Sequence, residues 1–117
     1  MTNERVAGFV LAATNTKEMA DFYQAALGIE FSQLAAYGTT LYRGQVGAFA
    51  ITICPNTIAG VVAEQSRHQV TYAVDSLEDS VNRLAALGYE AVLSDASSPR
   101  SAMATDPDGN TLELAQA

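Results

Sequence analysis

The sequence is poor in basic residues, in cysteine and in long apolar runs. Its 117 residues hold 6 lysines and arginines against 13 aspartates and glutamates, a formal net charge of −7. A phosphate-binding surface needs clustered cations, so we expect no nucleic-acid partner. The single cysteine, Cys54, cannot form an internal disulfide, and because it ends an apolar run we expect a small buried side chain.

No apolar run approaches the length of a membrane span, and the N-terminal residues lack the basic and apolar regions of a signal peptide. The sequence therefore predicts a cytoplasmic protein without membrane contact. A composition of 49% hydrophobic and 16% charged residues is typical of a folded globular chain. At this length the chain forms one domain that is large enough to bury a core.

The chain divides into two halves with the same order of elements. In the first half, an apolar run over 6–13 predicts a strand, an amphipathic pattern that Gly28 closes predicts a helix, and three more strands end at Cys54. The second half begins with a strand over 68–74 and continues with a helix that Gly88 ends. Its remaining strands are expected at 90–93, 101–104 and 111–114. Each half has the order βαβββ.

The spacing of glycines indicates a duplication. Gly28 and Gly88 lie 60 residues apart, each after a leucine, and Gly47 and Gly109, which open the last strand of each half, lie 62 apart. The predicted fold class is α+β, with two βαβββ repeats forming a curved, half-barrel mixed sheet and helices on its outer face. We expect repeat 1 over about 5–54, a linker over about 55–67 and repeat 2 over about 68–117.

The C-terminal turn and strand place a single carboxylate on one face of the sheet. The run 106–110, Asp-Pro-Asp-Gly-Asn, combines a fixed φ, a glycine and side chains that bond their own backbone, so it predicts a tight turn. The strand that follows alternates, with Leu112 and Leu114 on one face and Glu113 on the other. Glu113 is therefore the first candidate for a functional residue.

These motifs resemble those of the vicinal oxygen chelate superfamily, which includes glyoxalases, bleomycin-resistance proteins, fosfomycin-resistance proteins and extradiol dioxygenases. The resemblance rests on Phe22-Tyr23 before Leu27-Gly28, on the second helix end at 84–90, and on the terminal motif at 106–114. It covers nearly the whole chain. It implies the fold given above, a small-molecule site on the inner face and commonly a homodimer, which would also cover exposed sheet edges.

The resemblance also implies a set of metal-ligand positions, on the first and last strand of each repeat. In this sequence they fall on Gly8, Ile51, Gln69 and Glu113, and neither glycine nor isoleucine has a side chain that can coordinate. A catalytic divalent ion needs about three protein ligands, so no metal is expected. The alternative is a divalent metal on Gln69, Glu113 and His68, which would reach the site only through a β-bulge, or on a partner-chain residue.

Other residues are candidates for the wall of a ligand pocket. Thr71 follows Gln69 on the inner face, which is otherwise lined by small residues, among them Val10 and Ala12. Further candidates for ligand binding are Tyr42, Arg100 and Met103. Tyr42 is either a packing residue or a ligand contact, and Arg100 is either a solvated loop residue or an anchor for an anion. Glu113 is either hydrated, bonded to Gln69, or a general base or anchor for a basic ligand.

The complete fold signature and incomplete ligand set favour a small-molecule-binding protein without a catalytic metal, as the resemblance to bleomycin-resistance proteins implies. The alternative is a divalent-metal-dependent lyase or dioxygenase of the same superfamily. A third alternative is a structural or regulatory dimer without a pocket.

Overall fold

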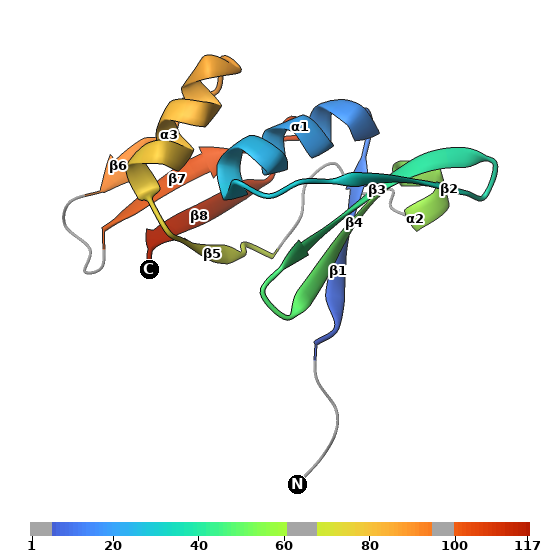
Figure 1. Ribbon diagram of the computed structural model, residues 1–117. Coiled ribbons are helices and arrows are strands. Elements are labelled where there is room, and N and C mark those ends of the chain that lie inside the picture. The colour runs from blue at the N-terminus through green and yellow to red at the C-terminus, as the bar shows by residue number, and fades with distance from the viewer. Residues whose placement is uncertain (1–5, 61–67, 95–99) are drawn as a thin grey trace, which may run out of the picture.

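The computed structural model describes residues 6–60, 68–94 and 100–117 and confirms two repeats of the order βαβββ (Figure 1). The elements of the first repeat are β1 (Gly8–Ala13), α1 (Thr16–Leu27), β2 (Ser32–Ala36), β3 (Thr39–Val46) and β4 (Phe49–Pro55). A short α2 (Asn56–Ala59) follows, inside the expected linker. The elements of the second repeat are β5 (Thr71–Val74), α3 (Leu77–Ala86), β6 (Val92–Ser94), β7 (Ser101–Thr105) and β8 (Thr111–Gln116). The rest of the linker and the loop before Arg100 lie outside the described residues.

Each repeat forms its own four-stranded sheet. The strand orders are β1-β4-β3-β2 and β5-β8-β7-β6, and in each sheet the first strand runs parallel to the last while the other pairs are antiparallel. The predicted α+β class with mixed pairing is confirmed. Helix α1 packs on the first sheet and α3 on the second, so each sheet has one face that carries neither helix.

The helices begin at equivalent caps. The side chain of Asn15 accepts a hydrogen bond from the Glu18 N–H at 3.0 Å, and Ser76 accepts one from the Asp79 N–H at 3.2 Å. The two caps lie 61 residues apart, from 15 to 76. Helix α1 ends at Gly28, whose φ of 68° suits a residue without a Cβ.

Four strands, β1, β2, β5 and β6, begin two or three residues later than their sequence patterns suggest. Strand β2 starts at Ser32 rather than Ile29, because the segment before it is held against α1, where the Phe31 N–H donates to the Gln24 side-chain oxygen at 3.2 Å. Strand β5 starts at Thr71 rather than His68. The chain around His68 therefore precedes the second sheet rather than belonging to it.

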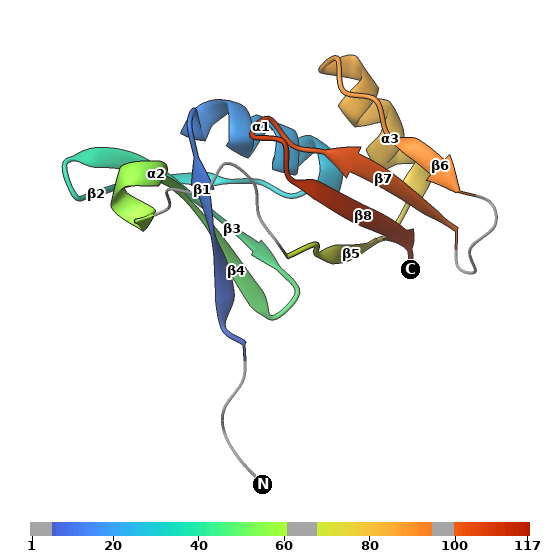
Figure 2. The ribbon, with the colours of Figure 1, turned by 180° about the vertical axis from the view of Figure 1, so that it is seen from behind.

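The core lies between the helices and the faces of the two sheets that the helices cover. Phe22 is fully buried there and makes edge-to-face contacts with Tyr23 and Tyr89, at ring-centroid distances of 5.1 and 4.9 Å. Helices α1 and α3 lie side by side in both views (Figures 1 and 2). The Arg83 Nε donates to the Ala25 carbonyl at 2.7 Å, which joins the two helices.

The C-terminal turn links the second repeat to the first. Asp106 is 4% exposed, and its carboxylate accepts hydrogen bonds from the Asp108 N–H, from the N–H and side chain of Asn110, and from the Tyr23 hydroxyl at 2.9 Å. Burial, together with the negative charge of Asp106, raises the pKa of Tyr23 well above its ordinary value. The hydroxyl therefore stays protonated and donates to the carboxylate. The C-terminal turn motif, which predicted the fold, therefore also connects the second repeat to the first.

Candidate ligand-binding faces

The second sheet exposes a row of four side chains on the face that α3 leaves uncovered. Strand register places Thr71 opposite Glu113, Glu113 opposite Met103, and Met103 opposite Val92, so the four point to the same side. We call these four residues the second row. The neighbouring Leu112 is buried in the core, as the alternation of β8 requires.

Hydrogen bonds hold the polar members of this face together. The Thr71 hydroxyl donates to Glu113 Oε1 at 3.0 Å. The Gln69 Nε2 donates to the Thr111 hydroxyl at 2.9 Å and contacts the Met103 sulfur at 3.3 Å. The structure therefore brings the predicted Gln69, Thr71, Met103 and Glu113 to one face, although Gln69 bonds to Thr111 and not to Glu113.

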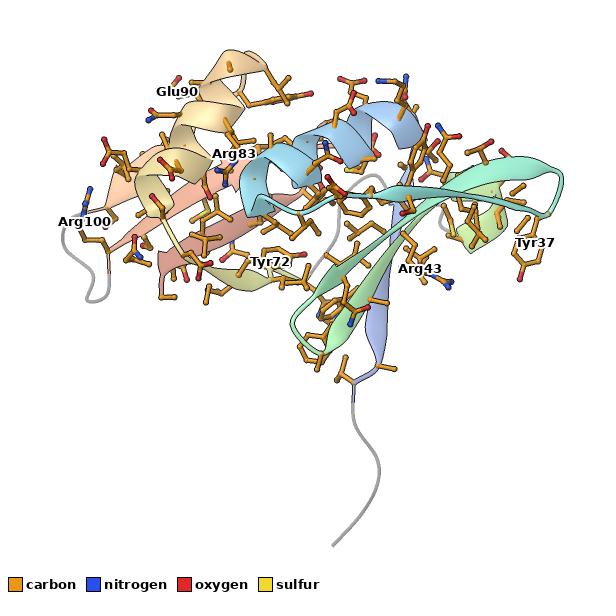
Figure 3. All side chains as sticks on the ribbon, in the orientation of Figure 1. Tyr37, Arg43, Tyr72, Arg83, Glu90 and Arg100 are labelled. Atoms are coloured by element: carbon orange, nitrogen blue, oxygen red, sulfur yellow. The ribbon has the colours of Figure 1, made fainter. Side chains whose placement is uncertain are left out.

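The first sheet exposes an equivalent row. Strand register aligns Ser32, Arg43, Thr52 and Val10, which we call the first row. The Arg43 Nε donates to the Thr52 hydroxyl at 3.1 Å, and Val10 is 62% exposed. Figure 3 shows the Arg43 side chain pointing away from the second sheet. The row thus presents a cation beside an apolar side chain.

The two rows occupy corresponding positions of the repeats. Val10 and Thr71 are separated by 61 residues, as are Thr52 and Glu113, which matches the spacing of the helix caps. The counterpart of Glu113 is therefore Thr52. The prediction of Ile51 at this position was wrong, because it was counted from the turn glycines, whose spacing differs by one residue, and a shift of one residue reverses the face of a strand.

Ile51 lies on the core side of β4 and is 0% exposed. Gly8, the remaining predicted ligand position, has no room for a side chain, because a Cβ there would overlap the Ala50 carbonyl oxygen. The close approach of β1 to β4 explains why residue 8 is a glycine and not a residue with a side chain.

The side chains at these positions do not fit a divalent ion held by three protein ligands of one chain. Glu113 offers a carboxylate, Gln69 an amide and Thr52 a hydroxyl already bonded to Arg43. Among the described residues, no group of three or more histidine, cysteine, aspartate or glutamate side chains is placed to bind a metal. His68 is exposed and lies three residues before β5, and its role as a third ligand stays a prediction.

Two predicted pocket residues lie elsewhere. Tyr42 pairs with Ile53 on the core side of the first sheet and is partly buried there, so it acts as a packing residue and does not belong to the row of Arg43. Arg100 immediately precedes β7, and its carbonyl accepts the Gln116 N–H at 2.9 Å. Figure 3 places it at the end of the molecule opposite Arg43. The Arg100 residue is exposed there.

Neither row lines the depression at the tip of the first sheet. This depression has a volume of about 460 Å³ and is lined by Ala35, Ala36, Gly38, Thr39 and Thr40. It offers no charged side chain.

None of the helices in the described part of the chain has the length and apolar character needed to cross a bilayer.

The duplicated βαβββ unit, the mixed sheets and the terminal turn define a protein of the vicinal oxygen chelate superfamily. Within it, the chain belongs to the glyoxalase-like domain family, whose model matches residues 8–115. No curated protein sequence matches the chain significantly.

Solved structures with the same fold include proteins of different activity. An antibiotic-binding protein from Streptomyces sp. CB03234 is 18% identical, with 99% of this chain and 98% of that chain covered and a TM-score of 0.71. A fosfomycin resistance protein from Listeria monocytogenes is 16% identical, with coverages of 99% and 95% and a TM-score of 0.73. A glyoxalase-related enzyme from Fulvimarina pelagi is 19% identical, with coverages of 97% and 88% and a TM-score of 0.72. At such identities the likeness concerns the fold alone, so function must be argued from the site.

Proposed function

We propose that this chain is a single-domain, cytoplasmic protein that binds a small, partly apolar molecule without a catalytic metal and acts as a homodimer. The observation that carries the proposal is the set of side chains at the four ligand positions, Gly8, Thr52, Gln69 and Glu113. Gly8 is closed to any side chain, Thr52 is bonded to Arg43, and Glu113 is the one carboxylate among the four ligand positions. A site built in this way retains hydrogen-bonding groups for a ligand but lacks the three protein ligands of a catalytic metal.

The apolar part of the proposed ligand is inferred from the exposed side chains of the two rows. Val10 is 62% exposed, Val92 63% and Met103 43%. Val10 stands beside Thr52 and Met103 beside Glu113, while Val92 extends the apolar surface beside Met103. Apolar side chains with a few fixed polar groups are the usual lining of a small-molecule site. The flexible Met103 can adapt to different ligand shapes.

The homodimer is inferred because one chain leaves both rows uncovered. Arg43 points away from the second sheet (Figure 3), so the first row does not face the second row of its own chain. Among the described residues, neither Arg43 nor Glu113 has an oppositely charged partner within 4.0 Å. Pairing the first row of one chain with the second row of its partner brings opposite charges together, whereas pairing like rows brings like charges together. A twofold arrangement of this kind forms two equivalent cavities.

The rival function is a divalent-metal lyase or dioxygenase in which Glu113 and Gln69 bind the ion together with His68 or a residue of the partner. It is favoured by the shared face of Gln69 and Glu113. In that case, or in a metal-free reaction, Glu113 is also the candidate general base, because it is the carboxylate of the second row.

Metal analysis and thermal unfolding distinguish these functions. Protein purified without chelators is expected to carry far less than one metal ion per chain, and saturating 2-methylnaphthalene, a neutral apolar probe, is expected to raise its melting temperature by several degrees. A stoichiometric metal that is lost on Glu113→Ala substitution would overturn the proposal in favour of the rival. Absence of any stabilisation by the probe would contradict a ligand-binding role.

A further inference from the structure

We propose that the ligand is dipolar, with an anionic group bound by Arg43 of one chain and a cationic group bound by Glu113 of the partner subunit. This inference rests on the proposed function, because the two rows meet only in the homodimer. It adds the chemical class of the ligand and a residue, Arg43, that recognises it.

Arg43 is held in a position to bind an anion. It lies on β3, which has a neighbouring strand on each side, and its Nε donates to the Thr52 hydroxyl at 3.1 Å. This bond fixes the guanidinium group while its terminal nitrogens remain for a ligand. No carboxylate of the described residues lies within 4.0 Å of the guanidinium group. A planar, permanently charged group of this kind suits a carboxylate or phosphate.

Glu113 is held in a corresponding way. Its Oε1 accepts the Thr71 hydroxyl at 3.0 Å, and the side chain is half-buried. No cationic side chain of the described residues lies within 4.0 Å of it. A half-buried carboxylate without a counterion gains from a ligand cation, because burial removes part of the water that would otherwise stabilise its charge.

Arg43 and Glu113 lie on rows that occupy corresponding positions of the two repeats, so in a homodimer they form two walls of one site. In each row a threonine on a neighbouring strand orients the charged side chain, Thr52 for Arg43 and Thr71 for Glu113. The two rows therefore carry opposite charges, although Arg43 and Glu113 themselves are not at corresponding positions, since the counterpart of Glu113 is Thr52. When the first row faces the second row of the partner, a cation and an anion stand on opposite walls of one cavity.

The apolar members of the rows define the middle of the ligand. Val10 stands next to Thr52 and Met103 next to Glu113, and both side chains are exposed. The ligand class that fits is an elongated molecule with a carboxylate or phosphate at one end, an amine at the other and an apolar centre. A neutral apolar molecule fills the centre but satisfies neither charge.

Four naphthalene probes test this class. They are 6-(aminomethyl)-2-naphthoate with both charges, 2-naphthoate with the anion, 2-naphthylmethylammonium with the cation, and neutral 2-methylnaphthalene. Because the chain has no tryptophan, naphthalene fluorescence reports binding without interference from indole. The doubly charged probe is expected to bind about tenfold more tightly than either singly charged probe, since each added charge-assisted hydrogen bond contributes on that order.

Two variants test which side chain binds each charged group of the probes. Arg43→Ala is expected to weaken binding of both probes that carry the carboxylate, by about tenfold, and to leave 2-naphthylmethylammonium unchanged. Glu113→Ala is expected to weaken both probes that carry the amine and to leave 2-naphthoate unchanged. Arg100→Ala and Glu90→Ala, which remove the same charges from places outside the rows (Figure 3), serve as matched controls and leave all four affinities unchanged.

The outcomes separate this inference from the function on which it rests. If 2-methylnaphthalene binds as tightly as the doubly charged probe, or if Arg43→Ala and Glu113→Ala affect all probes equally, the dipolar ligand is refuted while a ligand-binding function stands. If none of the four probes binds, both the inference and the proposed function are contradicted.

Discussion

Asp106 shows how a residue expected to shape a turn also joins the two repeats. Its local bonds to the backbone of Asp108 and Asn110 were predictable, because aspartate at this place in a turn bonds its own chain. Its bond to the Tyr23 hydroxyl was not, because 83 residues separate the partners in sequence. Local chemistry is visible in a sequence, whereas a contact between repeats depends on how they pack.

The buried tyrosines near Asp106 predict an alkaline loss of stability. Burial, with a contribution from the Asp106 charge, raises the pKa of Tyr72 to about 12, and Tyr23 is raised as well. Both pKa values lie above the value of about 10 for an unfolded chain, so the unfolded state loses its protons first and stability falls as pH rises beyond 10. Each tyrosine contributes a slope of about 1.4 kcal/mol per pH unit until the pH reaches its folded pKa.

Urea unfolding between pH 9 and pH 12 measures this slope. Tyr72→Phe is expected to flatten it relative to the wild type, since one titrating group is removed. Tyr37→Phe, a change at an exposed turn, controls for the loss of a hydroxyl group as such. A Tyr72→Phe protein with the wild-type slope would contradict the assignment.

At the site, the sequence predicted polar residues on the open face of the second sheet but not the charged residue of the first row. Glu113, Thr71 and Gln69 followed from strand alternation and the terminal turn. Arg43 was not assigned to the site, because the facing of β3 was not fixed by its own sequence pattern. A usable signal was present in the helix caps: aligning the repeats on Asn15 and Ser76 matches Thr52 with Glu113, and Arg43 lies opposite Thr52.

At the scale of the elements, the pairing of β1 with β4 leaves no space for a side chain at Gly8. A Cβ at this position would overlap the Ala50 carbonyl oxygen, and that oxygen belongs to the paired backbone and cannot move cheaply. Gly8→Ala is therefore expected to lower the free energy of unfolding by about 2–4 kcal/mol.

Chemical denaturation compares this variant with Gly38→Ala. Gly38 has a φ of +72° but open space around it, so only backbone strain of about 1 kcal/mol is expected there. A Gly8→Ala protein as stable as the wild type would show that β1 and β4 can separate. In that case, Gly8 could also be replaced by a metal-binding side chain.

The elements themselves were largely predictable, and their boundaries less so. The two helices were predicted, and the glycines Gly28 and Gly88 marked where they end. The delayed start of β2 was not predictable, because it depends on the bond between Phe31 and the Gln24 side chain on α1. An extended segment that bonds to a helix has the same local pattern as one that bonds to a strand.

At the scale of the whole molecule, the sequence predicted two repeats but not the direction in which their open rows point. That direction depends on how α1 packs against α3, through contacts such as Arg83 with the Ala25 carbonyl. Since one chain leaves both rows uncovered, the proposed site belongs to a pair of chains. The opposite charges of Arg43 and Glu113 determine which rows meet.

Sedimentation velocity of charge-reversed variants at low ionic strength tests this pairing most directly, and it needs no ligand. Arg43→Glu and Glu113→Arg each place like charges across both cavities of a homodimer, so each variant alone is expected to dissociate more readily than the wild type. Mixing the two variants restores opposite charges in both cavities of the mixed dimer, and the double variant restores them in its own homodimer. We therefore predict monomers for each single variant and dimers for the mixture and for the double variant. Single variants that remain as dimeric as the wild type, or a mixture that stays monomeric, would contradict a site shared between the first row of one chain and the second row of its partner.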